Sequence, residues 1–321
     1  MDKPVNAIPC ADEITEAHHR IRPFINRTPV LTSHSLNACF GGEVYFKCEN
    51  FQKVGAFKAR GATNAIMQLD DALLSHGVAT HSSGNHAQAL SWAASLRKTP
   101  AFIVMPLNSS TVKVQAVKEY GGKITFCEPT LEARESTLKK LLEETSATEI
   151  HPYNNYHIIC GQATTALELL EEIPALDLVF APVGGGGLLS GTALSIHYFS
   201  PETKVIAVEP EQANDAYLSF IQRRFIPSVN PDTIADGLRT SLGSLTYPII
   251  LSHVHDILTV SEKAIIYAMR VIWERMKILI EPSSAVPLAA LFERKIDIKN
   301  KRTGIILSGG NVDLDHLPWI K

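Results

Sequence analysis

The sequence has little of several features that mark whole classes of protein. Its five cysteines are odd in number and scattered, with no Cys-x-x-Cys pair, which fits free thiols in a reducing compartment. No stretch approaches the roughly 18 apolar residues that a membrane-spanning helix needs. The N-terminal segment also lacks the apolar core of a secretory signal. We therefore expect a cytoplasmic protein that has no membrane partner.

The chain also lacks an excess of charge of either sign. The formal net charge is -3, the signs are interspersed and no basic run occurs, so a nucleic-acid partner is not expected. The histidines have no metal-binding spacing that is supported by other ligands. With 321 residues, 45% of them hydrophobic and 20% charged, the chain has the composition of a globular protein of about two domains.

What the sequence does have is a regular alternation of short apolar runs with amphipathic segments. This alternation predicts an α/β fold with mainly parallel sheets, in which sites lie beyond the carboxyl ends of the strands. Strands are predicted over residues 44–46, 77–80, 101–105, 123–126, 178–181, 204–208 and 304–307. Helices are predicted over residues 58–69, 85–95, 111–120, 131–144, 161–170, 188–199, 262–276 and 284–292.

Residues 77 to 151 form a compact β-α-β-α-β-α run in this prediction. Such a run can make a small domain that is inserted into a larger one. We expect a small mobile domain over residues 77–154, inserted into a large domain built from residues 1–76 and 155–321.

Four consecutive glycines join a predicted strand to a predicted helix: Gly184, Gly185, Gly186 and Gly187. Their backbone N–H groups can approach an anion at the helix start, where the helix dipole favours negative charge. The spacing matches neither the dinucleotide fingerprint nor the P-loop. A phosphate cradle is favoured over the alternative, a flexible turn.

A second strand-to-helix junction reads Ser82-Ser83-Gly84-Asn85. Successive N–H groups and two hydroxyls at a helix start suit a carboxylate, although simple N-capping is the alternative. Ser308 follows a third apolar strand, where it is either a turn residue or a site residue.

Acidic residues follow a fourth strand, at Glu209, Glu211 and Asp215. Hard cations such as Mg²⁺ or Ca²⁺ take carboxylate and carbonyl oxygens as ligands. A solvated acidic loop is the alternative explanation.

Lys58 begins a predicted helix, after Gly55 and Ala56 and beside Phe57. A plain solvent-facing helix does not need small residues and an aromatic at this point. A lysine that forms a Schiff base needs a neutral amine, and a poorly solvated setting lowers the pKa of the ammonium group. Lys58 is therefore either a surface charge or a lysine held for chemistry.

Five segments, taken together and in their order along the chain, indicate a family: "GAFKARGATNA", "SSGNHAQA", "PVGGGGLLSG", "IADG" and "LSGGN". Together they resemble the fold-type II pyridoxal-5′-phosphate (PLP) enzymes, most closely the branch of serine racemases and serine/threonine dehydratases. The resemblance covers roughly residues 14–313. It implies a fold like that of tryptophan synthase β, a homodimer, and covalent attachment of PLP to Lys58.

The resemblance also implies how the cofactor would be held. Phe57 would pack beside the cofactor ring, and the four glycines would bind the phosphate. Asn85 would bond the 3′-oxygen of the cofactor. Ser308 would face the pyridine nitrogen, where a neutral hydroxyl makes a weaker electron sink than a carboxylate and disfavours transamination.

For the substrate, the resemblance implies acid–base groups on both faces of Cα. Lys58 would serve one face and Ser83 the other. The residues implied to hold the substrate carboxylate are Ser82, Ser83, Asn85, His86 and, from the small domain, Arg134.

Two further ligand sites are implied. Glu209, Ala213 (through its carbonyl) and Asp215 match the divalent-cation site of the family, for Mg²⁺, Ca²⁺ or Mn²⁺. The residues that match part of an ATP site between subunits, and so suggest ATP as an activator, are Lys53, Gln88, Tyr120, Lys277 and Asn311.

The chain departs from the family at several positions. Tyr153 stands where vertebrate serine racemases have asparagine and dehydratase relatives commonly have tyrosine, Ala163 replaces a usual glycine, and Val54 replaces a polar residue. The serine run of aspartate-preferring relatives is absent after the His-Pro pair, so aspartate is discounted.

The expected activity is therefore interconversion of L- and D-serine, together with elimination of water from serine to give pyruvate and ammonia. The alternative is a dehydratase of serine, threonine or threo-3-hydroxyaspartate without significant racemisation. A third reading is a ligand-binding regulator that has lost catalysis.

Overall fold

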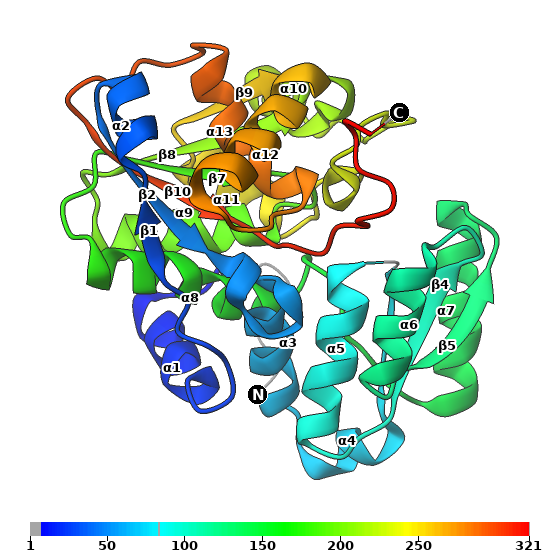
Figure 1. Cartoon of the computed structure of the whole chain (residues 1–321). Coiled ribbons are helices and arrows are strands. Elements are labelled where there is room, and N and C mark those ends of the chain that lie inside the picture. Colours follow the sequence, from blue (N-terminus) through cyan, green and yellow to red (C-terminus); the bar gives the residue numbers. More distant parts are fainter. Residues whose placement is uncertain (1–7, 83, 321) are drawn as a thin grey trace.

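Two sheets divide the chain into two lobes (Figure 1). The computed structural model describes residues 8–82 and 84–320. The larger lobe has a six-stranded sheet of order β1-β2-β10-β7-β8-β9, and the smaller lobe has a four-stranded sheet of order β5-β4-β3-β6. All strand pairs are parallel except β1 with β2, which is antiparallel. No helix in the described part of the chain is long and apolar enough to cross a membrane.

The strands are β1 (Val30–Thr32), β2 (Glu43–Cys48), β3 (Val78–His81), β4 (Ala101–Pro106), β5 (Lys123–Cys127), β6 (Thr148–Glu149), β7 (Leu178–Pro182), β8 (Lys204–Pro210), β9 (Asp256–Val260) and β10 (Arg302–Leu307). The α-helices are α1 (Ala11–Ile21), α2 (His34–Phe40), α3 (Lys58–Met67), α4 (Asp71–His76), α5 (Asn85–Leu96), α6 (Thr111–Glu119), α7 (Leu131–Thr145), α8 (Tyr156–Glu172), α9 (Gly187–Phe199), α10 (Asp215–Gln222), α11 (Thr246–His253), α12 (Glu262–Met276) and α13 (Pro282–Phe292). Short 3₁₀ helices are η1 (Glu49–Phe51), η2 (Lys53–Gly55), η3 (Glu211–Ala213) and η4 (Asp236–Leu238).

Every strand and helix predicted from the sequence is present, and the predicted α/β class is confirmed. The largest boundary error is at α8, which begins at Tyr156 rather than at Gly161. The prediction missed β1, β6 and β9 as well as α1, α2, α4, α10 and α11, most of which are short. The four-stranded sheet lies within residues 78–149, and the domain limits at residues 77 and 154 stay a prediction.

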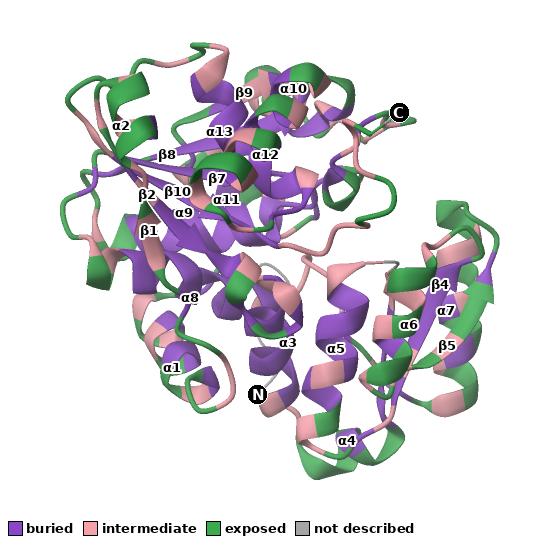
Figure 2. Cartoon of the chain, viewed as in Figure 1, coloured by how far each residue is buried: buried purple, intermediate pink, exposed green. Residues whose placement is uncertain are grey.

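The six-stranded sheet is buried on both faces. Strand β7 has all of its residues buried, as a central parallel strand covered on both sides requires. Helices α12 and α13 pack on one face and α9 and α11 on the other, and the buried residues of this lobe form a continuous interior in Figure 2. In the smaller lobe, α5 and α6 pack on one face and α7 on the other.

Glycines let three helices of the larger lobe approach closely. A β-carbon on Gly61 of α3 would lie 2.4 Å from Gln162 Nε2, and one on Gly161 of α8 would lie 2.6 Å from Gly61 Cα. A β-carbon on Gly191 of α9 would lie 2.5 Å from the backbone nitrogen of Ala163. Helices α3, α8 and α9 are thus stacked at the spacing that only glycine permits.

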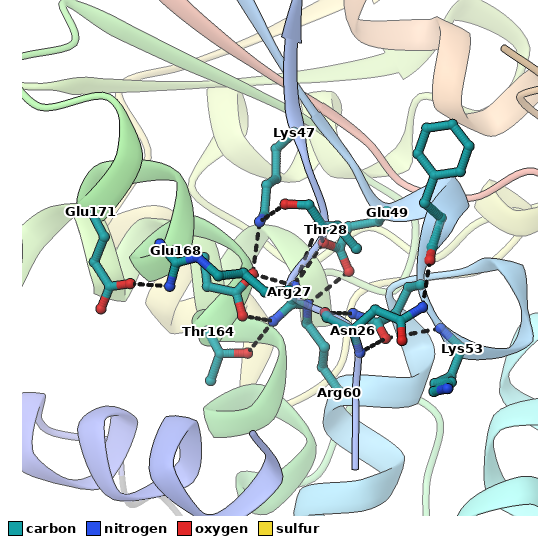
Figure 3. A network of polar contacts seen from close by, with 12 residues as sticks. Asn26, Arg27, Thr28, Lys47, Glu49, Lys53, Arg60, Thr164, Glu168 and Glu171 are labelled. Carbon is teal, nitrogen blue, oxygen red and sulfur yellow. Dashed lines mark hydrogen bonds and ion pairs between the residues drawn. The ribbon is translucent and has the colours of Figure 1, made fainter. Parts of the chain in front are cut away.

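A buried charge cluster ties β2 and η1 to α3 and α8 (Figure 3). It consists of Lys47, Glu49, Arg60 and Glu168, each with a side chain no more than 2% exposed. Arg60 donates hydrogen bonds to both carboxylates, with Nε 2.7 Å from Glu49 Oε2 and Nη2 2.7 Å from Glu168 Oε2. Lys47 Nζ lies 2.7 Å from Glu168 Oε2. The positive and negative charges of the cluster balance.

Candidate active site

A cavity of about 830 Å³ lies between the two lobes. The smaller lobe contributes the end of β3, the start of α5 and part of α7, and the larger lobe contributes the loops that follow β7 and β10. The predicted site residues that line this one cavity are Phe57, Lys58, Ser82, Asn85, His86, Arg134, Gly184, Gly185, Gly186, Gly187 and Ser308. Ser83 lies outside the described residues.

Lys58 is the first residue of α3, and it lines the cavity. Its Nζ donates a hydrogen bond to the carbonyl oxygen of Pro152 at 2.8 Å and lies 5.1 Å from the ring centroid of Phe57. Burial lowers the pKa of Lys58 to about 8, against the opposing effect of the Glu281 carboxylate. A substantial fraction of this amine is therefore neutral near physiological pH, as a Schiff-base lysine requires.

The four glycines form a cradle with no room for side chains. Gly186 has φ of 85°, in the left-handed region that favours glycine. A β-carbon on Gly185 would lie 2.3 Å from the Tyr153 ring, and one on Gly184 would lie 2.8 Å from Leu238 Cα. Because α9 begins at Gly187, the backbone N–H groups of its first turn are available to an anion.

Ser308 is 2% exposed and follows the carboxyl end of β10. Its Oγ lies 3.1 Å from Ser284 Oγ, and its carbonyl accepts a hydrogen bond from Phe57 N at 3.0 Å. The hydroxyl is thus neutral, and its nearest polar side chain is another hydroxyl. Lys58, the glycine cradle and Ser308 together fit PLP, which needs a covalent anchor, a phosphate site and a partner for the ring nitrogen.

Glu281 is a site residue that the sequence did not reveal. It is 4% exposed, lines the cavity, and accepts hydrogen bonds from Asn85 Nδ2 at 2.9 and 3.1 Å. Asn311 Nδ2 in turn donates to Asn85 Oδ1 at 2.8 Å. Burial and the nearby Asp236 raise the pKa of Glu281 to about 7. No local sequence pattern marks this glutamate, because only the fold brings it to the cavity.

Two cavity histidines are neutral. His86 Nε2 lies 3.0 Å from the carbonyl oxygen of Ile150, and burial lowers its pKa to about 3. The ring of His86 therefore offers no positive charge to a carboxylate, and its contribution is limited to the helix start. His151, which the sequence prediction did not include, accepts hydrogen bonds at Nδ1 from the backbone of Tyr153 and Asn154, and burial lowers its pKa to about 4.

Arg134 lies in the cavity wall, as predicted, and its Nε is buried with no hydrogen-bond partner among the described residues.

Tyr153 covers the glycine cradle. Its hydroxyl lies 2.9 Å from Thr240 Oγ1, and its ring packs edge-on to His151 at 4.6 Å between centroids. Tyr153 therefore connects the cradle to the wall of the cavity.

The predicted cation site is buried. Glu209 is fully buried and accepts hydrogen bonds from the backbone of Ala216 and Tyr217 at 3.1 and 2.9 Å. Asp215 is 4% exposed, and within the described chain no hydrogen bond of good geometry reaches either of its carboxylate oxygens, although Ser228 and the backbone of Leu242 lie near enough to act against the rise of its pKa. Burial raises the pKa of both carboxyl groups, and the two charges repel each other. Carboxylate oxygens of this kind are ligands that a hard cation takes, and Ala213, whose carbonyl was predicted as a third ligand, is buried at the end of η3, two residues before Asp215.

No cluster of three or more His, Cys, Asp and Glu side chains placed for a metal occurs within residues 8–82 and 84–320. Any cation at this site would therefore depend on the two carboxylates, backbone oxygens and water.

The structure gathers part of the predicted ATP site. Asn311 Nδ2 donates to the carbonyl of Val54, beside Lys53, and Gln88 is buried on the adjoining α5. Tyr120 packs against the same apolar cluster as Val54. Lys277 is exposed at the end of α12, and no hydrogen bond or ion pair joins it to the other residues of this set within the described chain.

Comparison with known proteins settles the family. The family model for pyridoxal-phosphate dependent enzymes matches residues 21–309. The chain belongs to this family.

The relatives are similar over nearly their whole length. The chain is 51% identical to a β-hydroxyaspartate dehydratase of Paracoccus denitrificans, over 97% of this chain and 99% of the relative. It is 50% identical to a serine racemase of Dictyostelium discoideum, over 96% of each protein. The structure of maize serine racemase superposes with a TM-score of 0.93 at 45% identity, over 96% of this chain and 95% of that one. The predicted family and the fold-type II architecture are confirmed.

Proposed function

We propose that the chain is a PLP-dependent serine racemase that interconverts L- and D-serine and also eliminates water from serine to give pyruvate and ammonia. The observation that carries the proposal is the meeting of a partly buried amine of lowered pKa, a glycine cradle and a neutral hydroxyl in one cavity. The similarity to several serine racemases over nearly the full chain supports the substrate.

The residues of this chain would have separate roles in the reaction. PLP, held covalently at Lys58, would withdraw electrons from Cα of the bound amino acid. The amine of Lys58, once released, accepts and returns the proton on one face of Cα. The start of α5 and Arg134 hold the carboxylate, because the first N–H groups of a helix lack acceptors within the helix and Arg134 Nε has no hydrogen-bond partner in the described part of the chain. The buried hydroxyl of Ser308 would serve as a neutral partner for the ring nitrogen of the cofactor in place of a carboxylate.

Racemisation needs a second proton-transfer group, and we assign this role to Ser83. The Ser83→Ala variant should lose racemisation of L-serine while largely keeping its dehydration, since only racemisation requires a proton from the opposite face. D-serine by chiral chromatography and pyruvate from the same reaction would measure both activities. An equal loss of both would mean that Ser83 only binds substrate, and pyruvate without D-serine in the wild type would make the protein a dehydratase.

A dehydratase of 3-hydroxyaspartate is the second candidate. The Paracoccus relative of that activity is 51% identical to this chain. Arg134 and Arg239 line the cavity, and neither has a carboxylate partner among the described residues, so a second substrate carboxylate could be bound. Comparison of kcat/KM for L-serine, L-threonine and L-threo-3-hydroxyaspartate separates the two candidates.

We also propose further ligands, an oligomeric state and a cellular location for the protein. We assign Glu209, Ala213 and Asp215 to a divalent cation, with Mg²⁺, Ca²⁺ and Mn²⁺ as the ions to test, on the basis of the unpartnered oxygens of Asp215. ATP as an activator rests on the partial grouping of Lys53, Gln88 and Asn311. A homodimer rests on the family resemblance, and a cytoplasmic location on cysteines that form no disulfide within the described residues.

A further inference from the structure

The Ile-Ala-Asp-Gly segment contains a cavity residue to which none of the roles above is assigned. Asp236 of this segment forms an ion pair with Lys113. Lys113 lies in the first turn of α6 in the smaller lobe, and Asp236 begins η4 in the larger lobe. Both line the cavity, and no other ion pair within the described chain has both partners in the cavity wall. The pair therefore joins the two lobes across the opening in which substrate would bind.

Asp236 is held in place by its surroundings. Its backbone N–H donates to the carbonyl of Ile234 at 2.8 Å, and the next N–H, of Gly237, donates to Ser283 Oγ at 3.2 Å. Ile234 N is itself bonded to Glu262 Oε2 at 2.8 Å. The segment also touches the glycine cradle, since a β-carbon on Gly184 would meet Leu238. The backbone at Asp236 is thus held in place beside the predicted phosphate site.

Lys113 belongs to the lobe that carries several of the predicted substrate ligands. Helix α6 packs on α5, whose start supplies predicted carboxylate ligands, and Arg134 comes from α7 in the same lobe. A contact that fixes α6 relative to Asp236 therefore also fixes the predicted substrate ligands relative to Lys58. The Lys113 and Asp236 side chains are 20% and 43% exposed. An ion pair that is partly solvated stabilises a closed arrangement modestly and so permits it to reopen.

We propose that Lys113 and Asp236 are positioning residues, whose ion pair holds the smaller lobe closed over the bound amino acid. This inference rests on the proposed function in that it takes an amino acid as the occupant of the cavity. Neither residue transfers a proton or touches the reacting atoms. Their effect is to place the start of α5 and Arg134 against the substrate carboxylate.

The test uses the holoenzyme with three variants: Asp236→Asn, Lys113→Met, and the charge exchange that combines Lys113→Asp with Asp236→Lys. Each single variant should raise KM for L-serine about three- to fivefold, the size expected for losing a partly exposed ion pair. The exchange variant should return KM toward the wild-type value, because it restores attraction with the charges reversed. Glu274→Gln breaks an exposed pair with Arg270 that is remote from the cavity, and serves as the matched control that leaves KM unchanged.

A second readout does not depend on turnover. Glycine lacks a β-hydroxyl and cannot be dehydrated, so it can occupy the site of the holoenzyme while hydrogen–deuterium exchange of residues 111–119 is followed. Glycine should slow exchange in this segment in the wild type and should slow it less in the single variants. In the exchange variant, the slowing should return toward that of the wild type. The proposal is overturned if the single variants keep both the wild-type KM and the protection, or if the exchange variant is no better than the single variants. A wild type that is inactive on L-serine but protected by glycine would instead contradict the proposed function.

Discussion

The charged side chains of the buried cluster and those of the cavity differ in how their hydrogen-bonding groups are satisfied. In the buried charge cluster, Arg60 donates to Glu49, to Glu168 and to Thr164, and Lys47 completes the balance. In the cavity, the ammonium of Lys58 has a single carbonyl as its hydrogen-bond partner, and Arg134 Nε has none within the described chain. The cluster is closed to further ligands, whereas the cavity is open to them.

The pKa values record the same difference. In the cluster, burial acts to raise the pKa of Glu168, but the hydrogen bonds and charges of Arg60 and Lys47 together outweigh it and lower the pKa to about 2, so the carboxylate keeps its charge. In the cavity, burial moves the pKa of Lys58 to about 8 and that of Glu281 to about 7, toward the neutral forms. Complete pairing keeps buried groups ionised and structural, while incomplete pairing leaves groups able to gain or lose protons.

The largest effect should come from removing the cavity amine. Lys58→Ala should lose at least about 1,000-fold in turnover, because it removes both the covalent anchor and a proton-transfer group. The visible absorption of covalently bound PLP should disappear as well, while the free energy of unfolding changes by less than about 1 kcal/mol. Absorbance spectra and urea unfolding would measure the two quantities. A retained visible band would contradict the assignment of Lys58.

Breaking the cluster should have the opposite profile. Arg60→Met leaves Glu49 and Glu168 with too few partners, so the free energy of unfolding should fall by about 3 to 5 kcal/mol. Urea unfolding of the cofactor-free protein would measure the loss. A decrease below about 1 kcal/mol would show that the cluster contributes little, and the comparison drawn above would then fail.

A smaller effect should follow from neutralising Glu281. The neutral fraction of Lys58 rises as pH passes its pKa of about 8, so capture of PLP by the cofactor-free protein should speed up across that range. The Glu281 carboxylate raises the pKa of Lys58. Glu281→Gln should therefore move the midpoint of the rate profile to lower pH. Rates measured from about pH 6 to 9.5 would test this, and a midpoint that rises would contradict it.

The smallest effect should come from Arg27→Ala, which is the matched control for Arg60→Met. Arg27 lies 2.6 Å from Glu171 on the same helix α8 that carries Glu168, but both partners are about half exposed. Its loss should change the free energy of unfolding by no more than about 1 kcal/mol, as exposed pairs do. A loss as large as that of Arg60→Met would mean that burial is not what separates the two pairs.

Much of the fold followed from local pattern. Apolar runs of strand length and amphipathic runs of helix length gave the order of the larger elements, because burial on both faces of a parallel sheet demands such runs. Strand β6 has two residues and is recognisable only through its pairing with β3. Such an element depends on contacts that local pattern does not show.

Some residues of the candidate site were likewise predictable from local sequence, and others were not. The glycine cradle and Lys58 lie in segments whose own residues are unusual, and these were predicted. Glu281 and His151 matter because the fold brings them to the cavity, and no local pattern marks them. The charge cluster is also invisible in sequence, since Arg60 and Glu168 are 108 residues apart.

The stacked glycines of α3, α8 and α9 have a consequence for which mutations would abolish activity. Helix α3 begins with Lys58 and α9 begins at the glycine cradle, so backbone contacts at Gly61, Gly161 and Gly191 set how far apart these two starts lie. A random-mutation screen for lost activity should therefore recover side-chain additions at these three positions, deep inside helices and away from any ligand. Such alleles would resemble catalytic mutants in a growth assay, although the altered residue touches neither substrate nor cofactor.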